Sequence, residues 1–334
     1  MNPRSGTIGF DPGAEPEGAG PSAVPAPRPR ARQIVVGEGE DGQRLDNWLI
    51  CRCPGVPKSR IYRIVRRGEV RVDGGRAKPT RRVRAGETVR VPPLALETRG
   101  PVRVPDALAR ALAARVVHSD PDFLVMDKPV GVAVHGGTGL AFGAIDALRQ
   151  GLGAPELELV HRLDRGTSGA LVVAVDRARA RELQGLFRER AVDKRYAAIL
   201  AGAWPGERRT VRLALSRMMR GGERLVAVDP DGASATSHFA VTERFGELAT
   251  AVDGDIETGR THQIRVHAQA SGHPVAGDER YGDARINARL ARSGVDRLCL
   301  HARAVGFRWR GRSVRVEVAP DDAWERTASR LRRG

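Results

Sequence analysis

A single carboxylate, Asp164, lies between Arg162 and Arg165 in the stretch HRLDRGTSG, residues 161–169. Neighbouring guanidinium groups favour the ionised form of an aspartate, in which it can act as a nucleophile or stabilise positive charge. A carboxylate beside a sugar–base bond can attack the sugar or stabilise an oxocarbenium-like centre, the chemistry that glycosidases use. Asp164 is therefore the predicted acidic group of a reaction at a glycosidic bond.

Three further clusters combine charged, aromatic and glycine residues, and none matches a common hydrolase or nucleotide-binding motif. The chain has neither a G-x-S-x-G elbow nor a G-x-x-x-x-G-K-[ST] loop. His262 and His267 are five residues apart, so on a strand they would face opposite ways, which argues against a shared metal ion. These patterns favour carboxylate chemistry without a metal or cofactor. The clusters are DKPVGVAVHGG (127–137), VDKRYAAIL (192–200) and IETGRTHQIRVHAQASGHPVAGDERYG (256–282).

The charge of the chain predicts a polyanionic partner. Its 334 residues carry 56 Lys or Arg and 40 Asp or Glu, a formal net charge of +16. Residues 41–93 alone hold 14 Lys or Arg and 5 Asp or Glu, or +9. Such a small basic segment repels itself unless phosphates neutralise it, so we expect it to bind nucleic acid. Arg60, Arg63 and Arg67 recur every three or four residues, on one helical face, and together with Lys58 they are the cations expected to contact RNA.

Other classes of protein are disfavoured. The three cysteines, Cys51, Cys53 and Cys299, form neither a disulfide framework nor a zinc-binding pattern. No run of 18 apolar residues predicts a transmembrane helix, and no basic amphipathic helix with a large aromatic face predicts binding to a membrane surface. The N-terminus also lacks the apolar segment of a secretory signal.

The elements that would position these residues begin with a small N-terminal module. Residues 1–32 are rich in Pro, Gly and Ala and are predicted to form a disordered tail. The module follows over 33–95. Its two predicted helices place Leu45, Trp48 and Leu49, and then Ile61, Ile64 and Val65, on their buried faces. Ser59 is the predicted cap of the second helix and Gly68 its end, and two short strands are expected near 70–72 and 88–91.

A linker over 96–112 and a larger domain over 113–325 are expected next. The segments FLVMDKP and GALVVAVD are typical of buried strands, and RARARELQGLFRER of an amphipathic helix. Because these segments lack regular βαβ spacing, we expect an α+β domain with a mixed, largely antiparallel sheet.

The N-terminal module resembles the alpha-L RNA-binding domain shared with a small-subunit ribosomal protein. The resemblance rests on RLDNWLI and on GVPKSRIYRIVRRGEVRVDGGRAKPTRRVRAGETVRV, where a helix, a Gly-Glu-Val strand and an Ala-Gly-Glu turn follow in order. It implies that two short helices and a few strands present a basic surface to structured RNA.

Taken together, the clusters resemble the RluA family of RNA pseudouridine synthases. The specific signal is HRLDRGTSG followed by TGRTHQIRVH and GHPVAGDERYG, and the resemblance covers residues from about 43 to 325. GVPKSRIYRIVRRGEVRV and LCLHARAVGF look most like the branch that modifies large-subunit (23S) ribosomal RNA. The resemblance implies that specific uridines are flipped out and isomerised to pseudouridine, without ATP, nicotinamide or metal. It also implies a cytoplasmic enzyme, expected to be monomeric, whose partner is ribosomal RNA and not a membrane.

The resemblance further implies a role for each matching residue. Asp164 matches the catalytic aspartate, and Arg265 matches the arginine that pairs with it. Tyr196 matches the tyrosine that stacks on the uracil and is a candidate to take the carbon-5 proton. Arg162 matches the residue that fills the gap left by the extruded nucleotide. Whether the aspartate attacks the sugar, attacks the base or acts as a base stays open, as does the effect of Gly166, where the family commonly has aspartate.

Several alternatives stay open at this point. His161, His267 and His301 are expected to pack or to form hydrogen bonds. Lys128 has a structural role or contacts phosphate, and Arg260 positions either RNA or Glu257. The whole protein could instead be a non-catalytic assembly factor that binds ribosomal RNA, an N-glycosidase that releases uracil, or a synthase of the same family with another RNA target.

Overall fold

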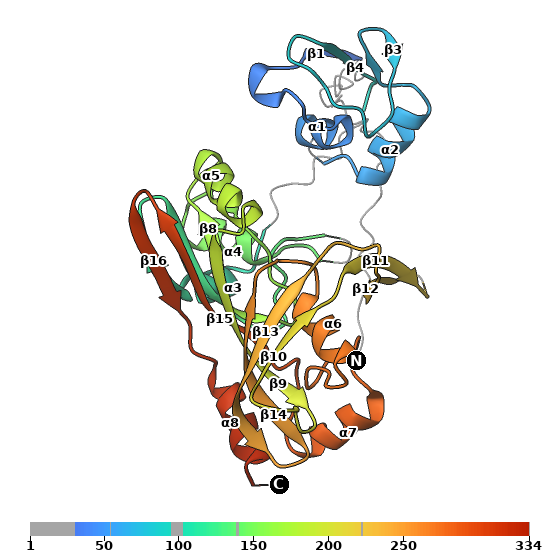
Figure 1. The fold of residues 1–334 in the computed structure, drawn as a ribbon. Helices are drawn as coiled ribbons and strands as arrows, with labels where there is room; N and C mark the ends of the chain where they lie inside the picture. Colours follow the sequence, from blue (N-terminus) through green and yellow to red (C-terminus); the bar gives the residue numbers. More distant parts are fainter. Residues whose placement is uncertain (1–30, 54, 95–102, 138–139, 222, 334) are drawn as a thin grey trace, which may run out of the picture. The chain divides into compact units, whose positions relative to one another are not determined.

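The computed structural model describes residues 31–53, 55–94, 103–137, 140–221 and 223–333. The chain divides into two compact units, Met1–Gly100 and Pro101–Gly334 (Figure 1). Each unit buries its own apolar core. No helix in the described ranges is long and apolar enough to cross a membrane.

The first unit packs two short helices against a four-stranded antiparallel sheet. Leu45, Trp48 and Leu49 of the first helix are fully buried, as their spacing predicted. The strands are hydrogen-bonded in the order β1-β4-β2-β3. The elements are β1 (Arg32–Val35), a 3-10 helix (Glu38–Glu40), α1 (Leu45–Arg52), α2 (Lys58–Arg66), β2 (Arg71–Val72), β3 (Gly75–Arg76) and β4 (Thr88–Val91).

The second helix begins one residue before its predicted cap. Pro57, and not Ser59, occupies the capping position of α2. The carbonyl of Pro57 accepts hydrogen bonds from the amides of Arg60 and Ile61 at 2.9 and 3.1 Å. A proline at this place costs the helix no hydrogen bond, because amides before the first turn have no partner within the helix. Gly68 ends the helix as predicted, with a φ of 74°.

The first strand was not predicted. β1 pairs along its whole length with β4, from Arg32 opposite Val91 to Val35 opposite Thr88. The predicted tail therefore ends too late, because Arg32 already belongs to the sheet. The rest of that prediction, over residues 1–30, lies outside the described residues.

The second unit is built on a ten-stranded mixed sheet. Its order is β10-β13-β14-β9-β15-β8-β6-β5, with β16 paired to β15 and β7 to β8. β15 and β8 run parallel, and the other pairs are antiparallel, which confirms the predicted α+β class and largely antiparallel sheet. The strands are β5 (Val116–Ser119), β6 (Phe123–Lys128), β7 (Glu158–Leu159), β8 (Ser168–Ala174), β9 (Val192–Ala201), β10 (Arg208–Arg212), β13 (Thr236–Phe245), β14 (Ala249–Ile256), β15 (Leu300–Trp309) and β16 (Arg312–Glu317), and β11 (Leu215–Arg220) and β12 (Glu223–Val228) form a separate ribbon.

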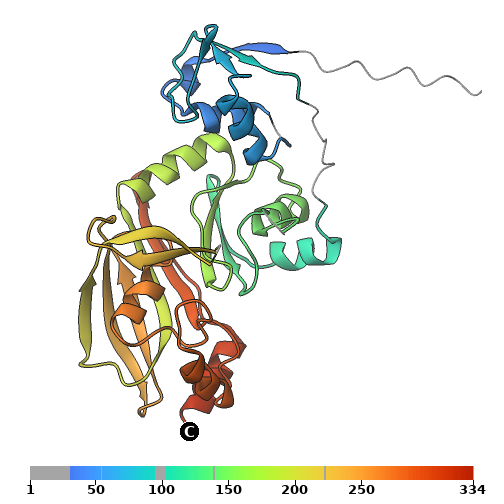
Figure 2. The ribbon, with the colours of Figure 1, turned by 90° about the vertical axis from the view of Figure 1, so that its right-hand side faces the viewer.

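Helices lie on both faces of this sheet (Figure 2). α6 packs with Ala198 and Leu200 of β9, whereas α7 and α8 pack with Ile199 and Ala201. Because side chains alternate along a strand, α6 covers the face of β9 that also carries Tyr196. The helices are α3 (Asp106–Ala113), α4 (Ala144–Gly151), α5 (Arg177–Arg188), α6 (Gln263–Ala270), α7 (Ala284–Arg292) and α8 (Asp322–Leu331).

This unit extends beyond both predicted limits of the larger domain. The linker expected over 96–112 overlaps α3, whose Ala109 and Leu112 are buried in one core with α4. The apolar residues of DALARALA recur at helical spacing, so this segment joins the core instead of connecting two domains. Residues 96–102 of that linker lie outside the described residues. At the other end, α8 continues past residue 325 because Leu331 is buried in the core.

Candidate active site

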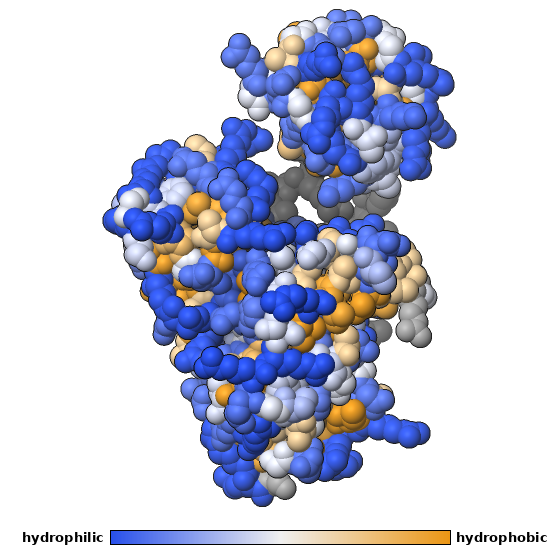
Figure 3. Space-filling model, in the orientation of Figure 1, coloured by the Kyte–Doolittle hydropathy of each residue, from blue (hydrophilic) through white to orange (hydrophobic). Residues whose placement is uncertain are grey.

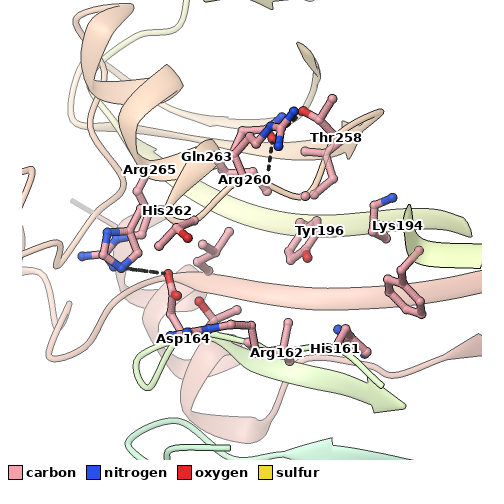
Figure 4. Close-up of a pocket in the computed structure, with 18 of the residues that line it drawn as sticks. His161, Arg162, Asp164, Lys194, Tyr196, Thr258, Arg260, His262, Gln263 and Arg265 are labelled. Atoms are coloured by element: carbon pink, nitrogen blue, oxygen red, sulfur yellow. Dashed lines mark hydrogen bonds and ion pairs between the residues drawn. The ribbon is translucent and has the colours of Figure 1, made fainter. Parts of the chain in front are cut away.

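The three predicted catalytic residues meet at a cavity of about 620 Å³ in the second unit. Asp164 comes from the loop between β7 and β8, Tyr196 from β9 and Arg265 from α6. In Figure 4, Asp164 lies at one end, Lys194 and His161 at the other, and Tyr196 between them. A cavity of this size is typical of a binding site for a small molecule or for one part of a larger ligand.

A buried lysine supports the loop that carries Asp164. Lys128, at the end of β6, is fully buried. Its Nζ donates hydrogen bonds to the carbonyls of Pro129 at 3.0 Å, Val132 at 2.8 Å and, more weakly, Arg165 at 3.4 Å. Burial lowers the pKa of Lys128 to about 7, although the charge of Asp164 opposes this shift. Of the two roles considered for Lys128, the structure shows the structural one, because a fully buried ammonium group cannot reach a phosphate.

The two arginines next to Asp164 in sequence do not pair with it. Arg165 donates from Nε to the carbonyl of Gly131 at 2.9 Å. Arg162 is exposed and lines the cavity. Among the described residues, the ion-pair partners of Asp164 within 4.0 Å are Arg265 and His262. The positive charge beside the Asp164 carboxylate therefore comes from α6, which is distant from Asp164 in the sequence.

The sheet reaches its one parallel pairing immediately after this loop. Gly169 of β8, with a φ of 103°, lies opposite Ala302 of β15. A Cβ at this glycine would come within 2.2 Å of the Ala302 carbonyl oxygen, so no other residue fits. Nearby, Gly166 packs so that a Cβ would come within 3.0 Å of Leu298 Cδ2. A larger residue at this position would require the Leu298 side chain to shift.

Arg265 lies on a helix, α6, and not on a strand of the kind considered for His262 and His267. Its side chain is about 10% exposed and bridges two carboxylates. Nε and Nη2 donate to the two oxygens of Asp278 at 2.7 and 2.8 Å, and Nη1 lies 3.4 Å from Asp164 Oδ2. Burial opposes the charge of Arg265, but the hydrogen bonds and charge of Asp278, with the charge of Asp164, raise its pKa further. The guanidinium is fixed and remains charged.

Asp278 is the anchor of this arrangement and was not predicted. Its side chain is fully buried and also accepts hydrogen bonds from the amides of Arg280 and Tyr281, both at 3.0 Å. Burial would raise its pKa, but the hydrogen bonds and charge of Arg265 lower it below the usual value. Gly277, with a φ of 74°, brings this segment within contact of the backbone of Arg297, where a Cβ would not fit.

His262 is the second close neighbour of Asp164. Its Nε2 lies 3.6 Å from Asp164 Oδ2, and its Nδ1 shares a hydrogen bond of 2.6 Å with the hydroxyl of Tyr281. Its backbone is left-handed, with a φ of 55°, which is a strained conformation often found at functional sites. Burial lowers the pKa of His262, while Asp164 opposes the shift. The ring of Tyr281 also lies under Arg265, with 4.9 Å between the guanidinium carbon and the ring centroid.

Tyr196 is half-buried in the wall of the cavity. Burial raises its pKa, and the negative charge of Asp164 raises it further. The phenol therefore stays protonated at neutral pH.

The remaining polar residues of the clusters have structural partners. His161 accepts the amide hydrogen of Val172 at Nε2, and burial lowers its pKa to about 4. His301 is hydrogen-bonded to Ser168 and to the Val318 carbonyl, both at 2.9 Å. These contacts are hydrogen bonds of the kind expected for both histidines.

His267 is also buried, and its Nε2 lies 3.3 Å from the Leu213 carbonyl, as expected. Arg260 does not pair with Glu257, which instead contacts His238 at 2.8 Å. The Nε of Arg260 lies 3.3 Å from the carbonyl of Ser234. Among the described residues, no group of three or more His, Cys, Asp or Glu is placed to hold a metal ion.

The cations predicted to contact RNA in the first unit lie on α2 and just after it. Lys58, Arg63 and Arg67 are exposed, and Arg60 is half-buried. Arg67 lies 4.0 Å from a Glu69 oxygen. The other three have no carboxylate within 4.0 Å in the described part of the chain. Hydrophilic residues cover most of the visible face of this unit (Figure 3).

The arrangement in the second unit places a carboxylate, paired with a guanidinium, in a cavity that an aromatic ring also lines. The positive charge of Arg265 is fixed before any ligand binds, which is the preorganisation that charge stabilisation requires. Asp164 and Tyr196 line the same cavity. Sequence reasoning found these three residues but missed Asp278, His262 and Tyr281. The motif GHPVAGDERYG contained two of them, but nothing in it indicated which side chains they contact.

Two family models match the chain. Residues 122–270 match the RNA pseudouridylate synthase family, and residues 43–89 match the S4 domain.

Curated relatives are similar over nearly their whole length. "Ribosomal large subunit pseudouridine synthase C" of Escherichia coli (strain K12) is 43% identical over 314 residues, which cover 91% of this chain and 98% of the relative. The protein of the same name from Salmonella typhimurium is 44% identical with the same coverage. That from Vibrio vulnificus is 45% identical over 84% of this chain and 89% of the relative.

Two solved human structures also resemble the chain. "Human RNA Pseudouridylate Synthase Domain Containing 4" has a TM-score of 0.57 and 26% identity, covering 68% of this chain and 96% of that structure. "Human RNA Pseudouridylate Synthase Domain Containing 1" has a TM-score of 0.53 and 29% identity, covering 65% and 94%.

Proposed function

Because this chain belongs to the RluA family of RNA pseudouridine synthases, we propose that it isomerises specific uridines of large-subunit (23S) ribosomal RNA. The observation that carries the proposal is the carboxylate of Asp164, which is paired with Arg265 and lines one cavity with Tyr196. The names of the relatives at 43–45% identity support the choice of ribosomal RNA. They also agree with the branch that the sequence suggested.

In the proposed reaction, the target uridine leaves its stack and enters the cavity, because its glycosidic bond is otherwise inaccessible. The carboxylate of Asp164 acts at the bond between N1 and the ribose, and this bond breaks. The uracil turns, its C5 forms the new bond to the same ribose carbon, and the C5 proton is lost while N1 gains one. All other atoms are retained, so the net reaction is an isomerisation.

The chain's own residues would divide this work. Arg265, fixed by Asp278, holds a positive charge beside the carboxylate of Asp164. The ring of Tyr196 stacks on the uracil, and base–aromatic stacking is worth about 1–3 kcal/mol. Arg162, exposed at the cavity, is proposed to fill the gap that the uridine leaves in the RNA.

The first unit is proposed to dock the RNA. Lys58, Arg60, Arg63 and Arg67 supply cations along α2, and three of them have no carboxylate partner among the described residues. Such cations bind phosphates by releasing counterions, with little dependence on base sequence. We further propose that the protein works as a cytoplasmic monomer.

Mapping of pseudouridine on unmodified 23S ribosomal RNA tests the proposal. The purified protein is incubated with the transcript, pseudouridines are labelled with carbodiimide, and primer extension locates them. We expect new stops with the native protein and none with Asp164→Asn. Asp231→Asn, which removes the charge of an exposed aspartate outside the cavity, should behave as the native protein.

Other outcomes separate the alternatives. Tight binding of the RNA by the native protein without any stops would indicate an assembly factor. Free uracil among the products would indicate an N-glycosidase. Stops on another RNA, but none on 23S ribosomal RNA, would retain the activity and overturn the substrate.

A further inference from the structure

We propose that the end of the cavity opposite Asp164 is a subsite for the nucleotide next to the target uridine in the same RNA strand. This inference rests on the proposed function and adds to it a second binding position. Lys194, Arg188 and Arg190 would hold the phosphate of that nucleotide, and the aromatic pair formed by His161 and Phe187 would contact its base. All five residues line the same cavity as Asp164.

The three cations of this subsite are free to take an anion. Arg188 and Arg190 are exposed and Lys194 is half-buried. In the described part of the chain, none of them has a carboxylate within 4.0 Å. Arg190 also has a left-handed backbone, with a φ of 61°, at the junction of α5 and β9. Three unpaired cations around one cavity repel one another unless an anion neutralises them.

Lys194 is the cation best placed to reach into the cavity. It lies two residues before Tyr196 on β9, so both side chains point to the same face of the strand. Two residues of a strand span about 7 Å, which is close to one nucleotide step of an extended RNA strand. Its Nζ donates to the carbonyl of Val192 at 2.8 Å. Burial lowers the pKa of Lys194, and a bound phosphate would reverse this shift.

The aromatic pair supplies a surface for a base. The rings of His161 and Phe187 are stacked, with centroids 4.6 Å apart and an interplanar angle of 15°. His161 accepts the amide hydrogen of Val172 at Nε2, and burial lowers its pKa to about 4, so the imidazole is neutral at pH 7. Neutral aromatic rings bind bases of any identity by stacking. Cations and aromatic rings together are the groups by which proteins bind single-stranded nucleic acid.

The position of the subsite identifies its occupant. In Figure 4, Tyr196 lies between Asp164 and Lys194. A uracil stacked on Tyr196 with its ribose at Asp164 leaves the Lys194 end of the cavity unfilled. The strand that carries this uracil must leave the cavity, and the nearest anion and base available to the Lys194 end belong to the adjoining nucleotide.

The phosphate contact is tested by the salt dependence of binding. Lys194→Gln should bind an unmodified 23S ribosomal RNA fragment about tenfold more weakly than the native protein. The slope of log affinity against log salt should fall in magnitude by about 0.7, the value for one phosphate contact with a single strand. Arg181→Gln removes one charge from the exposed face of α5, outside the cavity, and is the matched control. An unchanged slope for Lys194→Gln would overturn the phosphate contact, since a purely structural role does not alter counterion release.

The base contact is tested with abasic RNA. Phe187→Leu keeps an apolar side chain against the core of the second unit but removes the ring. On intact RNA with a mapped target uridine, we expect KM to rise about tenfold with little change in kcat. Replacement of the nucleotide in the subsite, which is either 5′ or 3′ of the target, by an abasic residue should raise the KM of the native protein by the same factor. The same replacement should not raise the KM of Phe187→Leu any further. An equal loss on intact RNA and on both abasic RNAs would overturn the base contact.

The two measurements separate this subsite from the proposed reaction. Affinity and salt slope do not require turnover, so they decide the phosphate contact even if no pseudouridine forms. Absence of pseudouridine with the native protein would refute the reaction alone. Normal turnover with an unchanged salt slope and unchanged KM in both variants would refute the subsite alone.

Discussion

The two ends of the cavity carry positive charge in different ways. At the Asp164 end, Arg265 is held by two carboxylates and is about 10% exposed. At the other end, Lys194, Arg188 and Arg190 have no carboxylate within 4.0 Å in the described ranges, and two of them are exposed. The first end is fixed before a ligand arrives, and the second is completed by the ligand. This difference separates groups that stabilise charge during a reaction from groups that hold a substrate.

A contribution to the stability of the fold does not explain the buried charges at the Asp164 end. The desolvation of a buried ion pair such as Arg265 with Asp278 offsets most of the attraction between the charges, so apolar residues of similar volume would stabilise the fold equally well. His262, beside the same carboxylate, also has a strained backbone. Costs of this kind are typical of a functional site. Of the three cations at the other end, Lys194 alone is half-buried, so it alone loses hydration before the ligand binds.

The largest effect should come from the fixed end, at the carboxylate itself. Asp164→Asn keeps the size of the side chain and removes its charge. We expect at least about a 1,000-fold loss in the single-turnover rate of pseudouridine formation, because the reacting group is lost. Affinity for RNA should stay within about threefold, since the distant cations bind the phosphates. A variant that loses affinity and keeps its rate would show that Asp164 belongs to the binding end.

Asp278→Asn should give the next largest effect. Without its anchor, Arg265 loses its position at Asp164, and a displacement of about 1 Å at a reacting group costs on the order of 100-fold in rate. We expect the loss in kcat, with KM nearly unchanged. The variant also leaves Arg265 without its main partner, so unfolding is measured in parallel. Tyr281→Phe is the milder companion variant, because it removes only the hydroxyl that contacts His262 and the amide of Val226. A rise in KM at constant kcat in Asp278→Asn would contradict a positioning role.

A smaller effect is expected from the cations of α2. The double variant Arg63→Gln, Arg67→Gln should weaken RNA binding about tenfold and reduce the salt slope by about 2, while the rate at saturating protein stays unchanged. Filter binding over a range of salt concentrations measures the slope. Arg66→Gln removes a single cation from the same helix, and its salt slope is compared with that of the double variant. A lower rate at saturation would show that these cations act beyond docking.

The smallest effect concerns the neutral imidazole at the Lys194 end. Because burial lowers the folded-state pKa of His161 to about 4, the unfolded chain takes up a proton first as the pH falls from about 6.5. The contribution of this residue to stability is therefore lost between about pH 6.5 and 4. His161→Gln should lose about 1 kcal/mol less unfolding free energy over that range than the native protein, as partial exposure reduces the full effect. Urea unfolding at several pH values measures the unfolding free energy of both proteins. An equal change of this free energy with pH in both would mean that His161 titrates normally.

The three residues expected at the cavity could be named from the sequence, but their surroundings could not. Asp164 was singled out by the arginines that flank it, and Tyr196 and Arg265 by the resemblance of their segments to the RluA family. The segment around Arg265 was considered only as a strand, when the spacing of His262 and His267 was weighed against a shared metal ion. It folds as a helix, and a buried network holds its start: Gln263 donates to the Thr236 carbonyl at 2.8 Å and accepts from Thr258 at 2.6 Å. No local pattern shows such contacts.

The same limit explains the other differences. Asp278 lies 13 residues from Arg265, and nothing in either segment indicates a pair before the fold is known. Lys194 was part of a quoted cluster, yet its relation to His161 and Phe187 depends on β9, a loop and α5 meeting in space. The apolar segments FLVMDKP and GALVVAVD did predict two buried strands, β6 and β8, because such a run depends on the burial of the strand itself.

The most direct test of the reaction at Asp164 is tritium release from ribosomal RNA labelled at carbon 5 of uridine. Formation of the new bond at C5 expels this hydrogen, whereas simple cleavage of the sugar–base bond does not. We expect the native protein to release tritium in amounts equal to the pseudouridine formed, with no free uracil, and Asp164→Asn to release none. Release of free uracil, or equal tritium release by Asp164→Asn, would contradict an isomerisation that depends on this carboxylate.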